Sequence, residues 1–398
     1  IRSDFLLVDK VEKLSDTSLA ITLKEPFPAL LDKLTVGIIP EHCFEGQDIN
    51  TAEFNTDPIG CGPYKFVSLE AGTKCTMTRF DDFYGDKANI ENIIYLYLPD
   101  YNTRALQLKN NEIDFTFVEP SQVKELEEDE NINVYVIGSA DYRCVMYNFD
   151  ACDVFEDVRV RQALNYATNK ESIVNDLLDG YGNPATGLMS PTVPYVTEEN
   201  SKGYPYDPDK AKELLKEAGY EDTDGDGIVE KDGEPLSLRL VFQTEEYASW
   251  KSLCEFLKSE YEKVGVGIEL VEKESAAYYD EIWNTRDYDL CIYRSYEDSW
   301  MPHGFLKSMF YAEDGAKAVN WYDEELNKDL GEVLKTQDEE KRTELYDKIL
   351  TRINDQAVTV PLYYPNRDYI YNNTRLTNVE LAPTAYEGIN WATLDVVE

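Results

Sequence analysis

Two spacings of apolar residues alternate between residues 236 and 294. Runs of consecutive apolar residues predict buried strands, and stretches in which apolar residues recur every three or four positions predict amphipathic helices. The runs are 236–242, 267–271 and 288–294, and the periodic stretches are 248–264 and 275–283. Strands and helices that alternate with short links are typical of a parallel sheet flanked by helices. This part of the chain is therefore predicted to be α/β.

The first 150 residues follow a different pattern, in which short runs are separated by glycine and proline turns. Such runs indicate short strands. The predicted strands are 4–8, 19–23, 75–80, 90–98, 114–118, 134–137 and 143–149, with a helix at 102–108. Residues 60–67 are predicted to be a glycine and proline turn that leads into a further strand. We expect a mixed α+β region here.

Helices dominate the segments on either side of the predicted parallel sheet. They are expected at 158–168, 172–178, 209–218 and 339–354, the last followed by a strand at 358–364. The helix at 209–218 has clear end signals. Asp207 is a typical cap, Pro208 suits the first helical position, and Gly219 suits the position after the helix.

The charge balance narrows the possible functions. Of 398 residues, 78 are Asp or Glu and 38 are Lys or Arg, which gives a formal net charge of −40 at pH 7. Such a chain repels phosphate backbones and anionic lipids, so nucleic acid and membrane surfaces are poor candidates for partners. A disordered acidic chain is also excluded, because 42% of the residues are hydrophobic and 29 are tyrosines.

Histidine and cysteine usage restricts the chemistry further. The chain has only His42 and His303, and its seven cysteines show no CxxC spacing. These counts disfavour histidine-based catalysis, imidazole metal sites, zinc ribbons and disulfide frameworks. No apolar run reaches 18 residues, so no transmembrane helix is expected. The start at Ile1, without a signal segment, is interpreted as processed, engineered or incomplete.

A candidate ligand site follows the strand predicted at 288–294. Ligands of open α/β sheets bind beyond the carboxyl ends of the strands. The segment 294–306, with the sequence RSYEDSWMPHGFL, lies at that position and combines charged, aromatic and imidazole side chains. The chain has no GxSxG, HExxH or phosphate-binding glycine motif that would indicate an enzyme.

Several motifs resemble, in the correct order, those of one protein family. Residues 57–66 (DPIGCGPYKF) are similar to its NP-x-GTGPY-x-F turn, and residues 158–167 (VRVRQALNYA) match its VRQALNYA helix. Further similar segments are 83–85 (FYG), 99–104 (PDYNTR), 111–114 (NEID) and 206–220 (YDPDKAKELLKEAGY). The family is the extracellular solute-binding proteins of ABC importers, family 5, which includes dipeptide, oligopeptide and nickel binders. Residues 342–364 and 302–306 look most like its nickel-importer branch.

The resemblance implies a two-lobed fold of the type II periplasmic-binding-protein class. The first lobe would comprise residues 1–148 and 383–398, and the second lobe residues 149–382. The family's N-terminal element, F-x-LR-x-G-x-x-F-x-DG, has no counterpart in this chain. The first lobe is therefore expected to be truncated at its N-terminus.

Alignment on Pro302 implies ligand roles for three residues. Asp298 falls where peptide-binding relatives hold an Asp that grips the α-ammonium group of the ligand. Tyr296 and Trp300 fall where the nickel branch has aromatic walls, and Asp314 stands where that branch has its metal-ligating His. Roles inside the protein fit these residues too, as a helix cap for Asp298 and as core packing for the two rings.

Four more residues are candidate ligand contacts. Arg294 ends a strand, where it pairs with a ligand carboxylate or with Asp298. His303 follows Pro302 and is either a ligand contact or a capping or packing residue. Tyr363 and Tyr364 are adjacent in a predicted strand, so one of them must face away from the site.

The acidic segment 222–234 (DTDGDGIVEKDGE) resembles a calcium loop. Asp222, Asp224 and Asp226 stand at loop positions 1, 3 and 5, and a glycine stands at position 6. Position 12, which requires a bidentate glutamate, is Gly233. Calcium binding and a plain acidic turn both fit this segment.

The sequence thus predicts the substrate-binding component of an ABC importer, which captures a short peptide or amino-acid-like solute between two lobes and delivers it to the permease subunits. The alternative is a nickel or metal-chelate binding protein, and a peptide hydrolase or a calcium-stabilised structural protein stands further behind. We expect a monomer that is not an enzyme and requires no cofactor. It would work at the extracellular face of the membrane, lipid-anchored, or in the periplasm.

Overall fold

The chain forms two compact units. The computed structural model describes residues 5–34, 37–295, 301–313, 316, 318–381 and 389–397. Unit 1 comprises Ile1–Leu34 and Gly138–Asn366, and unit 2 comprises Thr35–Ile137 and Arg367–Glu398.

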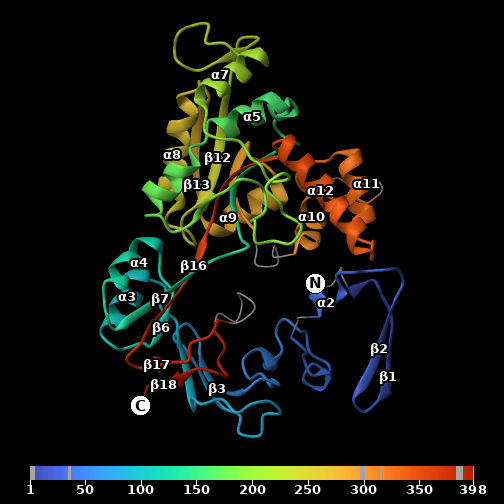
Figure 1. Cartoon of the computed structure of the whole chain (residues 1–398), viewed down its shortest axis with the longest axis vertical. Helices are drawn as coiled ribbons and strands as arrows, with labels where there is room; N and C mark the ends of the chain where they lie inside the picture. The colour runs from blue at the N-terminus through green and yellow to red at the C-terminus, as the bar shows by residue number, and fades with distance from the viewer. Residues whose placement is uncertain are drawn as a thin grey trace. The chain divides into compact units, whose positions relative to one another are not determined.

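A six-stranded mixed sheet lies at the centre of unit 1 (Figure 1). In order across the sheet, its strands are β13 (Gly267–Lys273), β12 (Ser237–Gln243), β14 (Leu290–Arg294), β8 (Arg143–Tyr147), β15 (Thr359–Tyr364) and β9 (Asn183–Pro184). β12 is parallel to both β13 and β14, which confirms the parallel unit predicted from the alternating pattern. β8, β15 and β9 extend the sheet by antiparallel pairing.

The helices of unit 1 start largely where the sequence offers a cap. They are α2 (Leu30–Lys33), α5 (Val158–Tyr166), α6 (Lys170–Ser172), α7 (Pro208–Glu217), α8 (Trp250–Glu262), α9 (Ser275–Asp280), α10 (Pro302–Phe310), α11 (Glu324–Val333) and α12 (Glu339–Asp355). Asp207, Asp323 and Asp338 each accept a hydrogen bond from the main-chain N–H three residues later, at 2.9, 2.8 and 2.8 Å. Such bonds satisfy donors that the first helical turn leaves open.

Both faces of the six-stranded sheet are covered. Every residue of β15 is buried, and so is every residue of β14 except Arg294. Buried residues of the sheet and of the helices form one hydrophobic cluster. Continuous burial of this kind is typical of strands with helices on both faces.

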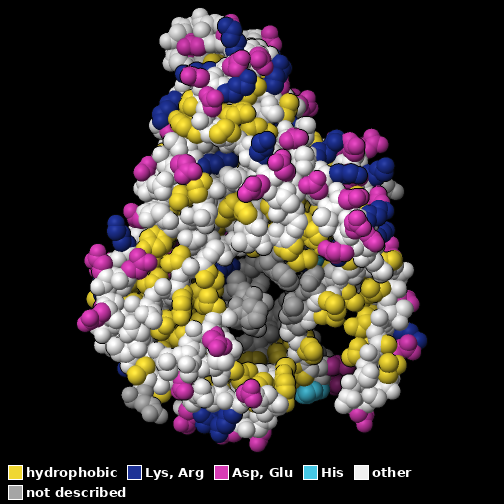
Figure 2. All heavy atoms as spheres, viewed as in Figure 1, with side chains coloured by type: hydrophobic (Ala, Val, Ile, Leu, Met, Phe, Trp, Pro, Cys, Tyr) yellow, Lys and Arg dark blue, Asp and Glu magenta, His cyan; other side chains and the backbone are white. Residues whose placement is uncertain are grey.

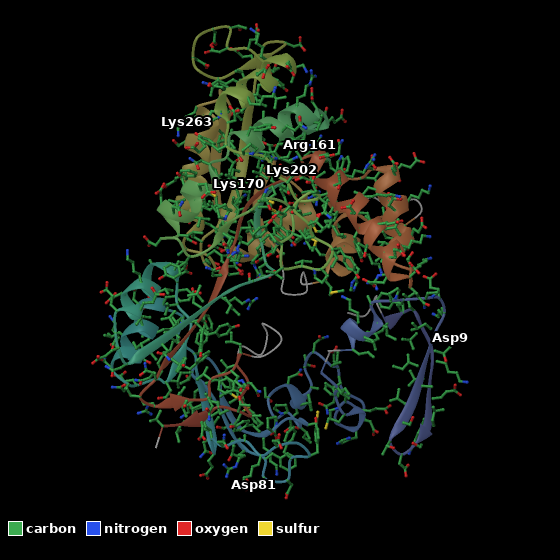
Figure 3. All side chains as sticks on the ribbon, viewed as in Figure 1. Asp9, Asp81, Arg161, Lys170, Lys202 and Lys263 are labelled. Atoms are coloured by element: carbon green, nitrogen blue, oxygen red, sulfur yellow. The ribbon has the colours of Figure 1, made fainter. Side chains whose placement is uncertain are left out.

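Two polar residues of the RQALNYA motif are buried inside unit 1. Arg161, labelled in Figure 3, is 2% exposed, and its guanidinium donates to the main-chain carbonyls of Phe155 and Gln356. The Nδ2 of Asn165 donates to the carbonyls of Arg161 and Thr359, each at 3.0 Å. These bonds tie α5 to the end of α12 and to the start of β15. The motif therefore supports the fold rather than the ligand site.

Unit 2 is built from small sheets. One contains β3 (Tyr64–Glu70), β4 (Lys74–Arg79) and β5 (Asn92–Leu96), a second β6 (Phe115–Thr116), β16 (Asn366–Asn372) and β7 (Ile132–Gly138), and a third β17 (Leu376–Thr377) and β18 (Asp395–Val396). The helices α3 (Tyr101–Lys109) and α4 (Pro120–Glu127) accompany them. A small buried cluster contains Tyr369, Tyr371, Leu376, Val379, Ile389 and Leu394.

The chain begins with a hairpin whose first strand differs from the prediction. β1 (Val8–Ser15) pairs with β2 (Ser18–Leu23) in antiparallel fashion. The second strand is confirmed, but a first strand at 4–8 is wrong, because β1 begins at Val8. The prediction relied on the apolar residues of 4–8. β1 itself has the sequence VDKVEKLS, and most of its residues are exposed, so it contains no apolar run.

The unit boundaries differ from the predicted lobe boundaries after residues 148 and 382. The units change at 34/35, 137/138 and 366/367. β8 pairs with β14 and β15 and so belongs to the sheet of unit 1, whereas β16 pairs with β6 of unit 2. Two lobes that close on a ligand stay a prediction.

The surface view in Figure 2 shows acidic side chains spread across the visible face of the molecule. This distribution agrees with the net charge of −40. Among the described residues, no helix combines the length and the apolar character needed to cross a bilayer.

Candidate functional site

The carboxyl ends of β12 and β14 meet at one edge of the unit 1 sheet. The two strands are parallel and end at Gln243 and Arg294. Ligands of such sheets bind beyond this edge. The chain continues from Arg294 into the predicted ligand segment, of which residues 296–300 lie outside the described residues. The roles of Tyr296, Asp298 and Trp300 therefore stay predictions, and Asp314 also lies outside the described residues.

Three side chains form a row across neighbouring strands at this edge. Arg294 of β14 is the register partner of Arg143 of β8. Arg143 is in turn the register partner of Tyr363 of β15. Directly opposite residues on paired strands have Cβ atoms about 5 Å apart. The row thus joins two residues that the sequence analysis named, Arg294 and Tyr363, through one that it missed.

The ring of Tyr247 makes a cation–π contact with both Arg143 and Arg294. The Cζ atoms of Arg143 and Arg294 lie 5.4 and 5.3 Å from the ring centroid of Tyr247. Tyr247 stacks on Trp250, with the ring centroids 4.5 Å apart and the planes 18° apart. Separations below about 6 Å are typical of cation–π contacts. The stacked rings therefore help to hold two cations side by side at the sheet edge.

Among the described residues, Glu246 forms an ion pair with Arg294 within this site. Its Oε2 lies 3.9 Å from Nη2 of Arg294, and it accepts hydrogen bonds from the hydroxyls of Tyr279 at 3.0 Å and Ser275 at 2.5 Å. The side chains of Arg294 and Glu246 are 24% and 37% exposed. An ion pair this long and this exposed contributes at most about 1 kcal/mol to stability. Both charges remain partly open to solvent.

His303 lies in the first turn of α10 and is 5% exposed. Phe305 and Leu306 of the same helix are also buried. The residue that precedes the helix, Met301, makes no side-chain cap hydrogen bond, and a capping role for His303 stays a prediction. This burial suits the packing role, and the ligand role stays a prediction.

The two adjacent tyrosines of β15 have different surroundings. The hydroxyl of Tyr364 donates to the carbonyls of Gly187 and Met189 at 2.8 and 3.0 Å and accepts from the N–H of Gly187 at 3.0 Å. Burial raises the pKa of Tyr364. The hydroxyl group of Tyr364 is therefore used for hydrogen bonds inside unit 1. Because alternate strand residues face opposite sides, Tyr363 is the better candidate for the ligand side.

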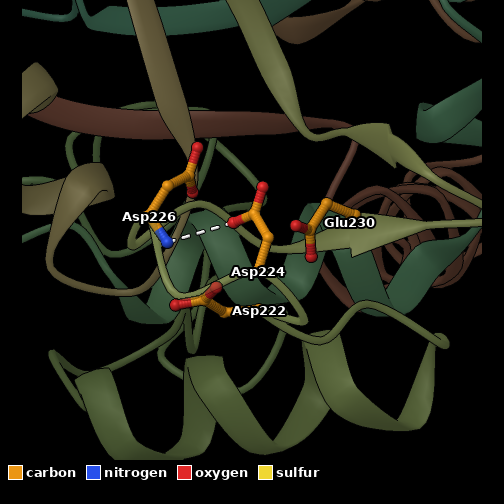
Figure 4. Close-up of side chains that lie close together, drawn as sticks. All are labelled: Asp222, Asp224, Asp226 and Glu230. Atoms are coloured by element: carbon orange, nitrogen blue, oxygen red, sulfur yellow. Dashed lines mark hydrogen bonds between the residues drawn. The ribbon is translucent and has the colours of Figure 1, made fainter.

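The acidic loop brings four carboxylates together, away from the sheet edge. Carboxylate oxygens of Asp222, Asp224, Asp226 and Glu230 all lie within 4.8 Å of one another (Figure 4). The three aspartates are exposed and Glu230 is partly buried. Glu230 stands at position 9 of the loop, which is also a ligand position of the twelve-residue template, often through a water, and which the sequence analysis did not name.

Main-chain N–H groups fix the acids of this loop. Asp222 accepts from Gly225 and Gly227 at 2.7 and 3.2 Å, Asp224 accepts from Asp226 at 3.0 Å, and Glu230 accepts from Thr223 at 2.8 Å. Gly225 and Gly227 have φ of +84° and +96°, which non-glycine residues rarely adopt. Gly225 and Gly227 therefore allow the loop to fold around its own carboxylates.

Sequence reasoning missed Arg143, Glu246 and Tyr247 as residues of the sheet edge. A signal for each was present. Arg143 begins a predicted strand, and Glu246 and Tyr247 follow the carboxyl end of another. The order of β14, β8 and β15 in the sheet could not be read from the sequence, because β8 and β15 come from segments far apart in the chain.

Comparison with known proteins places these features in a family. Residues 2–317 match the model of the bacterial extracellular solute-binding proteins, family 5 (middle region). The nickel-binding periplasmic protein of Escherichia coli (strain K12) is 31% identical over 401 residues, which cover 95% of this chain and 73% of that protein.

Solved structures are similar over nearly the whole chain. NikZ from Campylobacter jejuni, in complex with Ni(L-His), has a TM-score of 0.80 and 30% identity, covering 94% of this chain and 75% of that chain. The oligopeptide-binding protein AppA from Bacillus subtilis, in complex with a nonapeptide, has a TM-score of 0.82 and 25% identity, covering 100% and 79%. The α/β class with the type II periplasmic-binding-protein architecture is confirmed. The chain belongs to the bacterial extracellular solute-binding proteins of family 5.

Proposed function

We propose that this chain is the receptor of an ABC importer for a short peptide or an amino-acid-like solute. The observation that carries this proposal is the pair of guanidinium groups, Arg143 and Arg294, held by Tyr247 at the carboxyl edge of parallel strands. Such an edge suits a small ligand that carries an anionic group. A peptide or amino acid supplies a carboxylate for it.

Asp298 would bind the other end of the same ligand. Its position in the sequence, four residues before Pro302, matches the ammonium-binding Asp of peptide-binding relatives. A charge-assisted hydrogen bond from an ammonium group contributes about 1.5–3 kcal/mol. Tyr296 and Trp300 would supply apolar walls, and Tyr363 would line the same edge.

A nickel or other metal chelate is the second candidate ligand. The 31% identity to the nickel-binding periplasmic protein and the likeness to NikZ favour it. Asp314, where the nickel branch has a histidine, and the acid at Asp298 favour the peptide. The peptide therefore ranks first.

Titration calorimetry with Ala-Ala, Ala-Ala-Ala and the nickel–histidine complex tests this order. We expect a peptide to bind more tightly than the chelate. Asp298→Asn should weaken peptide binding at least tenfold, about 1.4 kcal/mol, because the ammonium group loses its counter-charge. Asp287→Asn, at the amino edge of the same sheet, is the matched control and should bind normally. Tighter binding of the chelate would reverse the order of the two candidates.

Binding without turnover distinguishes the receptor from a hydrolase. The peptide recovered from the protein after prolonged incubation should be intact by mass spectrometry. Accumulation of free alanine that depends on protein concentration would favour the hydrolase instead.

The working form is proposed to be a monomer whose two lobes close around the ligand and present it to permease subunits. It would act in the periplasm or at the outer face of the membrane, held there by a lipid anchor. A sedimentation experiment with and without ligand checks the monomer and its compaction.

We further propose that Asp222, Asp224 and Asp226, together with Glu230, bind calcium. The support is their mutual distance of at most 4.8 Å and the preference of calcium for carboxylate oxygens. Calcium at one hundred times its Kd would stabilise the fold by about 2.7 kcal/mol and raise Tm. Asp224→Asn should abolish that rise. An equal Tm in calcium and in a chelator would show that the loop is a plain acidic turn.

A further inference from the structure

A small cavity lies inside unit 1, beside the RQALNYA motif of α5. The polar residues that line it are Asn165, Thr186, Tyr204, Asn354 and Thr359, and the others are apolar. Its volume is about 10 Å³, and one water molecule needs roughly 10–15 Å³. The cavity therefore has the size of a single water molecule.

Asn165 is fully buried, and one polar atom of its side chain is left without a partner. Its Nδ2 donates to the carbonyls of Arg161 and Thr359, each at 3.0 Å, but its Oδ1 accepts from no donor among the described residues. Reversing the amide would not satisfy this oxygen, because it would then face two carbonyl oxygens. A buried acceptor without a donor costs free energy. The orientation of the amide is therefore fixed, and Oδ1 requires a donor.

Other polar side chains of the lining can hydrogen-bond to the same molecule. Thr359 is 4% exposed and carries a hydroxyl, which can both donate and accept. Asn354 accepts from the N–H of Gly203 at 3.0 Å through its Oδ1, and its Nδ2 offers donors. Buried waters typically make about three hydrogen bonds, whereas cavities that stay dry are lined by apolar groups. The lining therefore suits water better than an apolar occupant, and the exposed Thr186 connects it to solvent.

We propose that this cavity is the site of one structural water molecule, which donates a hydrogen bond to Oδ1 of Asn165. The hydroxyl of Thr359 and the side-chain amide of Asn354 are its other partners. Asn165 lies on α5, Asn354 in the last turn of α12 and Thr359 at the start of β15. The water thus joins three elements and completes the hydrogen bonds of the motif. This role does not depend on which solute the chain binds.

A crystal structure of the chain, at a resolution that shows ordered water, tests the site directly. We expect one peak of electron density about 2.8 Å from Oδ1 of Asn165. In solution, the chain with isotope-labelled asparagine should show an NMR cross-peak between water and the side-chain amide of Asn165. Its sign should be that of a bound water molecule and not of bulk water.

Variants of Thr359 test the second partner. Thr359→Val puts a methyl group in place of the hydroxyl and should weaken both the density and the cross-peak. Thr359→Ser keeps the hydroxyl and should retain them. Thr168→Val is the matched control, because the hydroxyl of Thr168 is also buried but already donates to the carbonyl of Leu164 at 2.8 Å. Thr168 is not part of the cavity lining, so its replacement should leave the water in place.

The wild-type chain alone can overturn the inference, so a variant that fails to fold does not leave it untested. Absence of either signal at Asn165 overturns it. So does a peak held by oxygens at about 2.3–2.6 Å, because such distances are typical of a bound calcium ion. Equal signals in Thr359→Val and wild type, or a loss in Thr168→Val as large as in Thr359→Val, overturn the partnership with Thr359.

Discussion

Unit 1 and unit 2 use their apolar residues in different ways. In unit 1, β14 and β15 are buried almost throughout and lie in one continuous cluster. In unit 2, several apolar side chains of β3 and β5 are 41–58% exposed, namely Val67, Leu69, Ile94, Tyr95 and Leu96. Burial of apolar surface is the main favourable contribution to folding. The row formed by Arg294, Arg143 and Tyr363 therefore lies in the better-packed unit. Such packing gives these side chains the rigid support that a candidate binding site requires.

The two units also bury charges of opposite sign. Lys170 of unit 1, labelled in Figure 3, is 7% exposed, and burial lowers its pKa to about 8. Asp368 of unit 2 has its pKa raised to about 6, first by burial and then by the nearby charges of Glu127 and Glu119. In both cases the environment favours the neutral form. The pH dependence of stability should therefore differ between the units.

The largest expected contrast is in core substitutions. Leu240 of β12 is fully buried, so Leu240→Ala should lower the free energy of unfolding by about 2–5 kcal/mol through lost burial and a cavity. Ile94 of β5 is 58% exposed, and Ile94→Ala should change it by no more than about 0.5 kcal/mol. Urea unfolding monitored by hydrogen exchange of each unit measures the change in the free energy of unfolding of both variants. Similar losses for the two variants would break the comparison.

The Lys170→Met substitution should give the next largest effect, an increase in the free energy of unfolding. A pKa lowered from 10.5 to about 8 corresponds to about 3 kcal/mol of unfavourable charge burial at neutral pH. Between these two pH values the unfolded chain binds more protons than the folded one, so the wild-type chain gains stability as pH rises above about 8. The variant should be more stable at pH 7 by up to about 3 kcal/mol and should lack this gain. Chemical unfolding at pH 7 and pH 9.5 tests both statements, and an equal pH slope in the two proteins would contradict the assignment to Lys170.

The parallel strands of unit 1 were predicted from the sequence, whereas β1, which also belongs to unit 1, and β16 were not, for a physical reason. Most residues of β12 and β14 are buried, so these strands appear as apolar runs, and the parallel pairing of β12 with β13 and β14 follows from the helices between them. β1 of the hairpin and β16 were missed because charged and polar residues interrupt them. α11 (Glu324–Val333) was also missed, although Asp323 offers a cap and Leu326, Leu330 and Val333 recur at helical spacing. That signal was present in the sequence and was overlooked.

The site was predictable only in part. A candidate ligand site at the end of β14 was predicted from strand direction, which the local pattern indicates, so Arg294 was named as a candidate; its ligand role stays a prediction. Arg143 and Tyr363 reach Arg294 through antiparallel pairings of β8 with β14 and β15, which join segments about 150 and 220 residues apart in a manner that no local pattern specifies. In the acidic loop, the three aspartates stand at template positions 1, 3 and 5, and Glu230 stands at position 9, which the sequence analysis did not name. Glu230 lies close to the aspartates because the loop turns back toward residue 221 through the bridge between Glu221 and Glu230.

The Asp368→Asn substitution in unit 2 should change the free energy of unfolding less than Leu240→Ala or Lys170→Met. The Oδ1 of Asp368 is buried without a hydrogen-bond partner among the described residues. Its folded pKa of about 6 lies above the usual value near 3.9, so the folded chain binds more protons between these pH values. The free energy of unfolding of the wild-type chain should therefore fall as pH rises from about 4 to about 6.

At pH 7 the Asp368→Asn variant should be more stable by about 1 kcal/mol, after allowance for the solvent that reaches this half-buried group. The gain should disappear near pH 4, where the carboxyl is protonated in both states. Asp81→Asn is the matched control in unit 2, because Lys87 and Arg79 hold the pKa of Asp81 below its usual value, so removal of this carboxylate should not stabilise the chain. Hydrogen exchange in β16 at pH 4.5 and pH 7 reads the effect locally. If the gain in stability persists unchanged at low pH, it comes from packing and not from the charge of Asp368. The expected difference between the two units in the pH dependence of stability would then be absent.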